Sequence, residues 1–176
     1  VLFPEQGYGF KRYGQVDKGG YSQEFFENVG YGDHYLKPIA AAALFGLINE
    51  LREKSITLSL GDMSSSTGTD PWQKGTSHHK GHGHLGKRSG LDVDFRYVNI
   101  YGKEIHSSVA TTDELFDIEK NTLIFKAVEK YGFTKNFQGI NGKIEDVKKI
   151  KGHDDHGHLG LDINKVNYKY VDKKPE

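Results

Sequence analysis

Two clusters of histidines hold the residues of this chain that are best suited to chemistry. Of the nine histidines, four lie within residues 78–84 and three within residues 153–158. In the second cluster His156 and His158 are two positions apart, so on a strand both imidazoles would point to the same face. Neutral imidazoles that share one space are suited to holding a metal ion or to transferring a proton. The alternative is a pair of histidines on an ordinary polar sheet surface.

An aspartate supplies a third candidate ligand. The segment LDVDFRYV at residues 91–98 alternates strictly, which predicts a strand with one apolar face. Asp94 falls on the polar face, although aspartate is uncommon in strands. One of Asp92 and Asp94 could act as a cap or pair with Arg96 while the other binds a metal through a carboxylate oxygen. A solvated strand face is the alternative.

The long loop before this strand contains the first histidine cluster. Residues 61–90 show no periodicity, and loops of this length in a compact domain are usually functional or disordered. A loop histidine, Asp94 and one histidine of the His-x-His pair would together form a His/Asp/His set. Three protein ligands with an open fourth position are the pattern of catalytic zinc, which activates a bound water. An incidental histidine-rich chelating tract is the alternative.

The elements around these residues predict an α+β fold. We expect a small, mainly antiparallel sheet with helices on one face and the zinc site on the other. Apolar periodicity predicts helices over about residues 38–54 and 117–131. Period-two alternation predicts strands over residues 56–60, 91–98 and 156–163, and a short strand over residues 133–137.

The last predicted strand should carry the His-x-His pair on its polar face. Leu159, Leu161 and Ile163 are expected to face the core, opposite His156 and His158. A polar, lysine-rich connection over residues 138–152 is expected to precede this strand.

Length and composition predict one domain with two terminal segments. The chain has 176 residues, which is about the size of one domain. Glycine and tyrosine are frequent in residues 1–35, so we expect an irregular arm packed on the domain. The domain that carries the expected zinc site should span residues 36–165, and residues 166–176 should form a polar tail that frays.

Charge and composition argue against several classes of protein. The 24 Lys+Arg residues balance 24 Asp+Glu residues, which argues against nucleic acid as a partner. No apolar stretch of about 18 residues is present, so no transmembrane segment is predicted. The chain has no cysteine, which excludes disulfides, thiolate zinc sites and cysteine nucleophiles. No signal peptide is expected within this chain, which begins at Val1 and could already have lost one. The sequence predicts no particular oligomeric state.

Four motifs occur in a recognisable order: GDMS at 61–64, the histidine-bearing loop, SGLDVDFRY at 89–97 and GHDDHGHLGL at 152–161. Together they resemble the penicillin-insensitive murein endopeptidases over roughly residues 36–163. These enzymes belong to a group with lysostaphin, the D-Ala-D-Ala carboxypeptidases and dipeptidases, and the hedgehog signalling domain. The resemblance implies a zinc metallopeptidase that hydrolyses D-amino-acid-containing peptide crosslinks of bacterial peptidoglycan. It also implies an extracytoplasmic location, either periplasmic or secreted.

The resemblance also implies roles for individual residues. In this group a histidine, an aspartate and the last histidine of a His-x-His motif hold the zinc. Carried over, Asp94 and His158 are expected as zinc ligands. The catalytic residue is expected to be His156, which acts as a base on the attacking water or orients it.

The first ligand does not carry over cleanly. The group's spacing, with six residues before the aspartate, places Lys87 where the ligand histidine should stand. We expect His84, three residues earlier, to move into the site through the glycine-rich loop, with His82 as a further candidate. The other interpretation is a lost ligand and a degenerate site.

Residues beside the expected ligands could tune them or bind substrate. A carboxylate next to a metal-site histidine fixes its tautomer and raises its basicity, and either Asp154 or Asp155 could do so for His156. His153 could assist in the site or cap a turn. Arg96 is a candidate for gripping a peptide carboxylate, as are Lys87 and Arg88.

Two other functions fit the same motifs. One is a D-Ala-D-Ala-type carboxypeptidase or dipeptidase, or a phage or secreted lysin; an exopeptidase needs a cation near the metal for the free carboxylate. The other is a metal-holding module that binds the cell wall without turnover. Lys87 at the expected ligand position is the feature that favours a degenerate site of this second kind.

Overall fold

A computed structural model describes residues 1–13, 33–68, 82 and 88–171 of the chain. These residues form an α+β fold with a seven-stranded sheet and three α-helices, so the predicted α+β class is confirmed, whereas the sheet is mixed. No helix among them is long and apolar enough to cross a membrane. His78, His79, His84 and Lys87 lie outside the described residues.

The sheet is mixed and has the order β1-β2-β3-β4-β7-β5-β6. Its strands are β1 (Gln6–Gly7), β2 (Phe10–Arg12), β3 (Leu58–Leu60), β4 (Asp92–Arg96), β5 (Phe137–Gly139), β6 (Lys148–Ile150) and β7 (His156–Gly160). The pairs β2–β3 and β5–β6 are parallel, and the other neighbouring strands are antiparallel. In the central β4–β7 pair, Asp94 lies directly opposite His158. This register brings together two motifs that are 64 residues apart in the chain.

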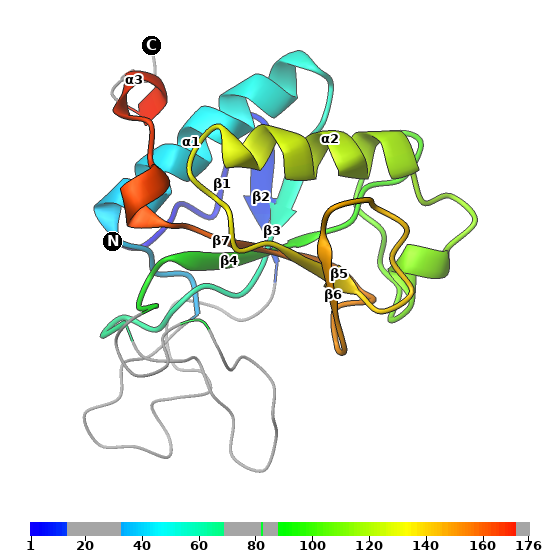
Figure 1. The fold of residues 1–176 in the computed structure, drawn as a ribbon. Coiled ribbons are helices and arrows are strands. Elements are labelled where there is room, and N and C mark those ends of the chain that lie inside the picture. Colours follow the sequence, from blue (N-terminus) through cyan, green and yellow to red (C-terminus); the bar gives the residue numbers. More distant parts are fainter. Residues whose placement is uncertain (14–32, 69–81, 83–87, 172–176) are drawn as a thin grey trace.

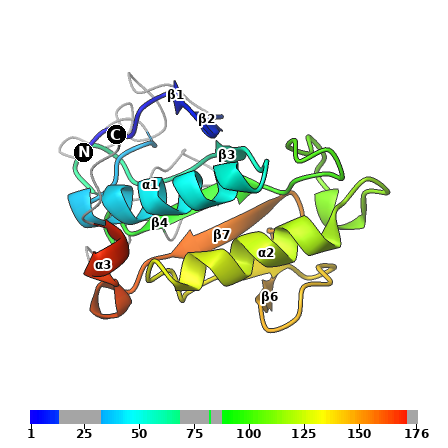
Figure 2. The ribbon, with the colours of Figure 1, turned by 90° about the horizontal axis from the view of Figure 1, so that it is seen from above.

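The helices are α1 (Pro38–Glu53), α2 (Ile118–Glu129) and α3 (Tyr168–Val171). Both helices predicted from periodicity are therefore confirmed, with ends within two residues of those expected. Pro38 suits the first turn of α1, where its missing N–H is not needed. Asp117 begins α2 by accepting a hydrogen bond from the backbone N–H of Lys120 at 2.8 Å. Figure 1 shows α1 and α2 on the same side of the sheet, and Figure 2 shows them side by side.

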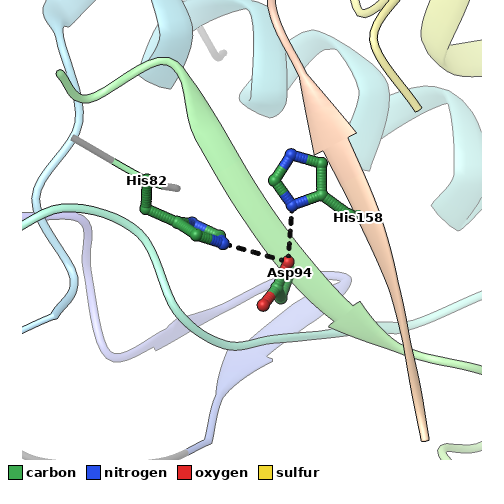
Figure 3. Close-up of side chains that lie close together, drawn as sticks. All are labelled: His82, Asp94 and His158. Atoms are coloured by element: carbon green, nitrogen blue, oxygen red, sulfur yellow. Dashed lines mark hydrogen bonds and ion pairs between the residues drawn. The ribbon is translucent and has the colours of Figure 1, made fainter. Parts of the chain in front are cut away.

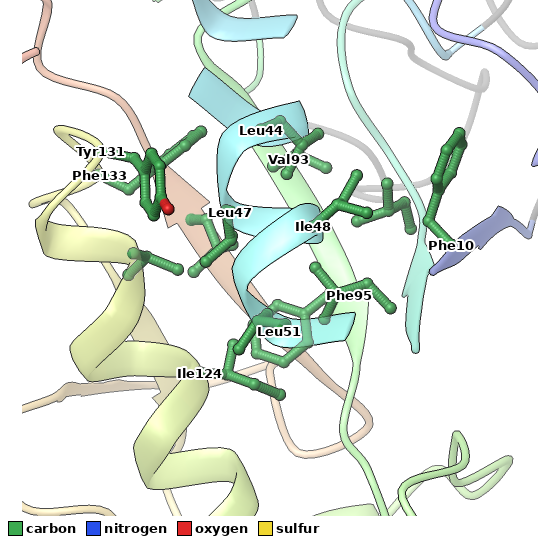
Figure 4. Packing of buried hydrophobic residues seen from close by; sticks show 14 of the residues in the cluster. Phe10, Leu44, Leu47, Ile48, Leu51, Val93, Phe95, Ile124, Tyr131 and Phe133 are labelled. Carbon is green, nitrogen blue, oxygen red and sulfur yellow. The ribbon is translucent and has the colours of Figure 1, made fainter. Parts of the chain in front are cut away.

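The core lies between these helices and the sheet (Figure 4). Leu47 and Leu51 of α1 pack toward Val93 and Phe95 of β4 and toward Ile124 of α2. All five side chains are fully buried. Burial of one such aliphatic side chain contributes about 1.5–3 kcal/mol, so this apolar face holds β4 firmly in place. The predicted alternation of β4 is confirmed, because its odd-numbered residues face the core.

The prediction of a short strand over residues 133–137 is wrong. Phe133 makes only an isolated bridge to Leu161, and the strand β5 begins at Phe137. The N–H groups of Thr134 and Lys135 both donate to the carbonyl of Gly160, at 3.1 Å each. Two donors on one carbonyl interrupt the alternating ladder, so no continuous strand runs from Phe133 to Phe137.

The last strand is shorter than predicted. β7 ends at Gly160, and Ile163 is 41% exposed instead of facing the core. Asp162 begins a short 3-10 helix over Ile163–Lys165 by accepting from the N–H of Asn164 at 3.0 Å. This local cap competes with strand extension, a tendency that apolar alternation alone does not reveal.

Both terminal segments contain more regular structure than the composition suggests. In the N-terminal segment, β1 and β2 extend the sheet beyond β3. After residue 165 the helix α3 packs near α1, and Tyr170 meets Tyr131 edge-on at 5.9 Å between ring centroids. The expected polar connection over residues 138–152 contains the end of β5 and the whole of β6.

Candidate metal centre

The polar face of the β4–β7 pair holds Asp94 and His158. Strand alternation turns both residues away from the core face formed by Val93, Phe95 and Leu159. Directly opposite residues on antiparallel strands lie within side-chain contact. Accordingly, Nδ1 of His158 is 3.0 Å from Oδ1 of Asp94.

His82 completes a buried group of three. Its Nε2 lies 3.4 Å from Oδ1 of Asp94, and its ring lies edge-on to that of His158, with centroids 4.9 Å apart (Figure 3). One ligand atom from each of the three residues lies within 4.8 Å of the others. Ligands at about 2.0–2.2 Å from a tetrahedral ion are roughly 3.4 Å apart, so small side-chain movements would close this set around a metal.

The structure thus brings together two expected ligands, Asp94 and His158, with the further candidate His82. The favoured first ligand, His84, lies outside the described residues. Nδ1 of His82 is buried and has no hydrogen-bond partner within the described part of the chain. The donor set of two imidazoles and one carboxylate is one that zinc accepts.

The electrostatics of the group favour an ionised Asp94 and a protonated His158. Burial acts to raise the pKa of Asp94, but the neighbouring His82, His156 and His158 hold it well below its usual value. Burial acts to lower the pKa of His158, but its hydrogen bonds with Asp92 and Asp94 outweigh this and raise it to about 9. Asp94 is therefore ionised at neutral pH. A bound metal would displace a proton from His158.

His156 lies beside this group without belonging to it. Its Nε2 is 3.4 Å from Oδ2 of Asp94, the oxygen that does not face His158. Its Nδ1 is 2.7 Å from Oδ1 of Asp155. Burial acts to lower the pKa of His156, but Asp94 and Asp155 raise it above the usual value. The ring is thus oriented by one carboxylate and close to another.

Asp155, of the two neighbouring aspartates, is the partner of His156, and Arg96 holds it. Nη1 of Arg96 lies 3.2 Å from Oδ2 of Asp155. The guanidinium also sits over the ring of Tyr13, at 4.5 Å from its centroid. Arg96 therefore already has a carboxylate and an aromatic partner. Asp154 instead fixes a turn by accepting hydrogen bonds from Thr111 and Asn141.

His153 lies beside His156, with ring centroids 4.6 Å apart. Burial and the neighbouring His156 lower its pKa to about 4. It is therefore neutral at pH 7. A neutral imidazole here adds no positive charge to the group.

Two contacts at the site were not predicted, one between Asp92 and His158 and one between Arg88 and Asp92. Asp92, the first aspartate of the DVD segment, lies 3.1 Å from Nε2 of His158. Arg88 binds Asp92, so the expected pairing of an aspartate of this strand with Arg96 is not what the structure shows. The i, i+2 spacing of Asp92 and Asp94 places both on one face, which is the signal that could have identified Asp92.

Comparison with known proteins adds no family to this description. No family model matches the chain, and no curated protein matches it. The geometry of the centre and the sequence motifs that contain its residues are therefore the basis for a functional proposal.

Proposed function

We propose that the protein is a zinc-dependent peptidase that hydrolyses peptide crosslinks of bacterial peptidoglycan. The observation that carries this proposal is the buried His82–Asp94–His158 group with His156 beside it. Three ligands with an open fourth position are the pattern of catalytic zinc, whereas structural zinc sites have four. Burial of all three residues argues against an incidental chelating tract on the surface.

The other residues suit a hydrolytic role. Zinc, when bound, supplies Lewis acidity, which polarises a carbonyl group and lowers the pKa of a coordinated water to about 7. His156 has its Nδ1 held by Asp155, which leaves Nε2 to accept a proton from the attacking water. The same nitrogen can then donate that proton to the leaving amine. Arg96 keeps Asp155 in place through its ion pair.

Neither α1 nor α2 stands over this centre. Helices α1 and α2 lie on one side of the sheet (Figure 1), whereas strand alternation turns Asp94 and His158 toward the other side. A substrate would therefore approach from the side of the sheet opposite these helices.

The sequence motifs and the contacts of Arg96 favour one class of peptide substrate. The resemblance of the GLDVDFR and HDDHGH segments to murein endopeptidases favours D-amino-acid-containing crosslinks and an extracytoplasmic location. An exopeptidase needs a cation for the free carboxylate, but Arg96 is bound to Asp155 and stacked on Tyr13. This engagement favours an endopeptidase over a D-Ala-D-Ala carboxypeptidase. The three donors in the His82 group argue against a degenerate binding module.

Digestion of purified, crosslinked peptidoglycan by the zinc-loaded protein tests the proposal. We expect mass spectrometry to show conversion of crosslinked dimers to monomers, and a chelator to stop it. Monomeric stem peptides with free D-Ala termini serve as the competing substrate. Preferential trimming of these termini would indicate a carboxypeptidase. No new fragment from a protein with one bound zinc per chain would overturn the proposal.

A further inference from the structure

His158 is held at both ring nitrogens by aspartates of β4. Nδ1 lies 3.0 Å from Oδ1 of Asp94, and Nε2 lies 3.1 Å from Oδ1 of Asp92. In the β4–β7 register Asp94 faces His158, and Asp92 faces Gly160 on the same side of the sheet. A ring bound at both nitrogens cannot turn without breaking a contact, so its orientation is fixed before any metal binds.

Asp92 is itself fixed by Arg88. The carboxylate is 2% exposed, and Arg88 donates to both of its oxygens, from Nε to Oδ2 at 3.0 Å and from Nη2 to Oδ1. Nη1 of the same guanidinium donates to the carbonyl of Leu161 at 2.8 Å. A bidentate fork of this kind specifies position as well as charge. Arg88 therefore ties the start of β4 to the residue that follows β7.

Gly160 provides the space for this pair. A Cβ atom at residue 160 would lie 2.7 Å from Nη2 of Arg88 and 2.7 Å from Oδ1 of Asp92. The backbone carbonyl of Lys135 would be 2.8 Å away. A side chain at this position would have to displace the pair or the backbone, so the packing of β7 is adapted to it.

We infer that Asp92 and Arg88 are positioning residues of the metal centre, which orient His158 so that Nδ1 is the nitrogen that binds the metal. Asp92 accepts the Nε2 proton, and this leaves the lone pair on Nδ1, beside Asp94. A carboxylate on the outer nitrogen of a metal-binding histidine fixes its tautomer and strengthens it as a ligand. Both oxygens of Asp92 are engaged by Arg88, which distinguishes this aspartate from the ligand Asp94. The inference rests on the metal site of the proposed function and not on its substrate.

Metal affinity of variants tests the inference without an activity assay. We expect Asp92→Asn to weaken zinc binding by about 10–100-fold, the usual effect of losing such an outer partner. Arg88→Lys keeps the charge but loses the bidentate hydrogen bonds. Its loss of zinc affinity should therefore be smaller than that of Arg88→Gln. Asp117→Ala removes a helix cap far from the centre and serves as the control for lost stability. Zinc dissociation constants are measured by competition with a chromophoric chelator.

Nitrogen identity supplies a second, spectroscopic readout. In the wild-type protein with ¹⁵N-labelled histidine and bound ¹¹³Cd²⁺, we expect the cadmium to couple to Nδ1 of His158. Coupling to Nε2 would overturn the inference, as would an unchanged zinc affinity in folded Asp92→Asn. If Asp92→Asn does not fold, Arg88→Gln takes its place. A zinc affinity in Arg88→Gln equal to that of the wild type would then overturn the inference. Tight zinc binding without hydrolysis would contradict only the proposed function. A wild-type protein that binds no zinc would contradict both the proposed function and the positioning role of Asp92 and Arg88.

Discussion

Two histidines of one strand differ in what surrounds them. The side chain of His158 is 8% exposed between Asp92 and Asp94, whereas that of His156 is 19% exposed and contacts Asp155 through Nδ1. Burial between two carboxylates suits a ligand, which must stay in place. Greater access, with one nitrogen held and the other near Asp94, suits proton transfer. In the proposed function, the His-x-His spacing therefore places a metal ligand and a proton-transfer group on one face of β7.

Replacing His156 should separate these tasks. We expect His156→Ala to retain one zinc per chain but to lose activity by about 10²–10⁴-fold, the usual contribution of a general acid–base group. Atomic absorption measures the zinc, and turnover of a purified crosslinked muropeptide measures the activity. His106→Ala is the control, because His106 is 68% exposed at its side chain and pairs with Glu104 instead. Full activity in His156→Ala would exclude His156 as the proton acceptor.

Replacing the loop histidines should identify the first ligand. We expect His82→Ala to weaken zinc binding by at least about 100-fold, since loss of an outer partner alone costs about 10–100-fold. His84→Ala should bind zinc almost as the wild type does. Titration of both variants with zinc against a competing chelator gives the two affinities. The reverse order would make His84 the ligand and His82 its neighbour.

At the element scale, periodicity predicted the helices and the two central strands. The apolar stripes of residues 38–54 and 117–131 correspond to α1 and α2, because burial against one core imposes a helical period. The strict alternation of residues 91–98 likewise matches the buried and polar faces of β4. Ends were predicted less well, as at Ile163, because caps and turns depend on local hydrogen bonds that have no period.

The sequence predicted the candidate site residues on regular strands more fully than those in loops. Asp94, His156 and His158 lie on strands, so their shared face followed from alternation. Nothing periodic distinguishes His82 from His84 in a glycine-rich loop, because its path depends on tertiary contacts. The pairing of Arg88 with Asp92 was missed for a related reason. Arg88 lies before β4, and its side chain reaches Asp92, the first residue of that strand, so strand alternation gives no sign of the contact.

The N-terminal cap of α2 should give a pH-dependent part of the stability. Burial acts to raise the pKa of Asp117, but hydrogen bonds from Lys120 lower it below the usual value. A carboxyl with a lowered folded-state pKa stabilises the fold above its unfolded pKa of about 4 and loses this effect as the pH falls through the folded value. We expect Asp117→Ala to cost about 1 kcal/mol at pH 7. Urea unfolding of both proteins should show this difference shrinking below about pH 4; a constant difference would contradict the prediction.

At the scale of the whole molecule, the N-terminal segment reaches the centre. Tyr13 follows β2, and its ring lies under the guanidinium of Arg96. Arg96 holds Asp155, which in turn holds His156. The segment that extends one edge of the sheet thus joins the residues proposed to move the proton. Through Tyr13 it bears on how Arg96 and Asp155 are oriented.

Removal of this aromatic contact should affect turnover without affecting zinc. We expect Tyr13→Ala to lower kcat by about 2–30-fold, since a cation–π contact contributes roughly 0.5–2 kcal/mol. Zinc content should be unchanged. The matched control is Tyr8→Ala, because Tyr8 stacks on Arg52 at 4.6 Å but lies away from the centre. Equal losses of activity in the two variants would indicate a general effect on stability.

Zinc should stabilise the whole fold, because its proposed ligands come from β4, from β7 and from the loop before β4. An ion that binds only the folded chain at 100 times its dissociation constant adds about 2.7 kcal/mol. For a chain of 176 residues this corresponds to a rise in Tm of roughly 5–10 °C, which calorimetry can measure. A chelator should reverse the rise, and Asp94→Ala should show none. Magnesium is the control ion, because it prefers oxygen ligands to imidazole. Binding of zinc with no change in Tm would mean that unfolded chains hold it as well, as a histidine-rich tract would, and would contradict a site built by the fold.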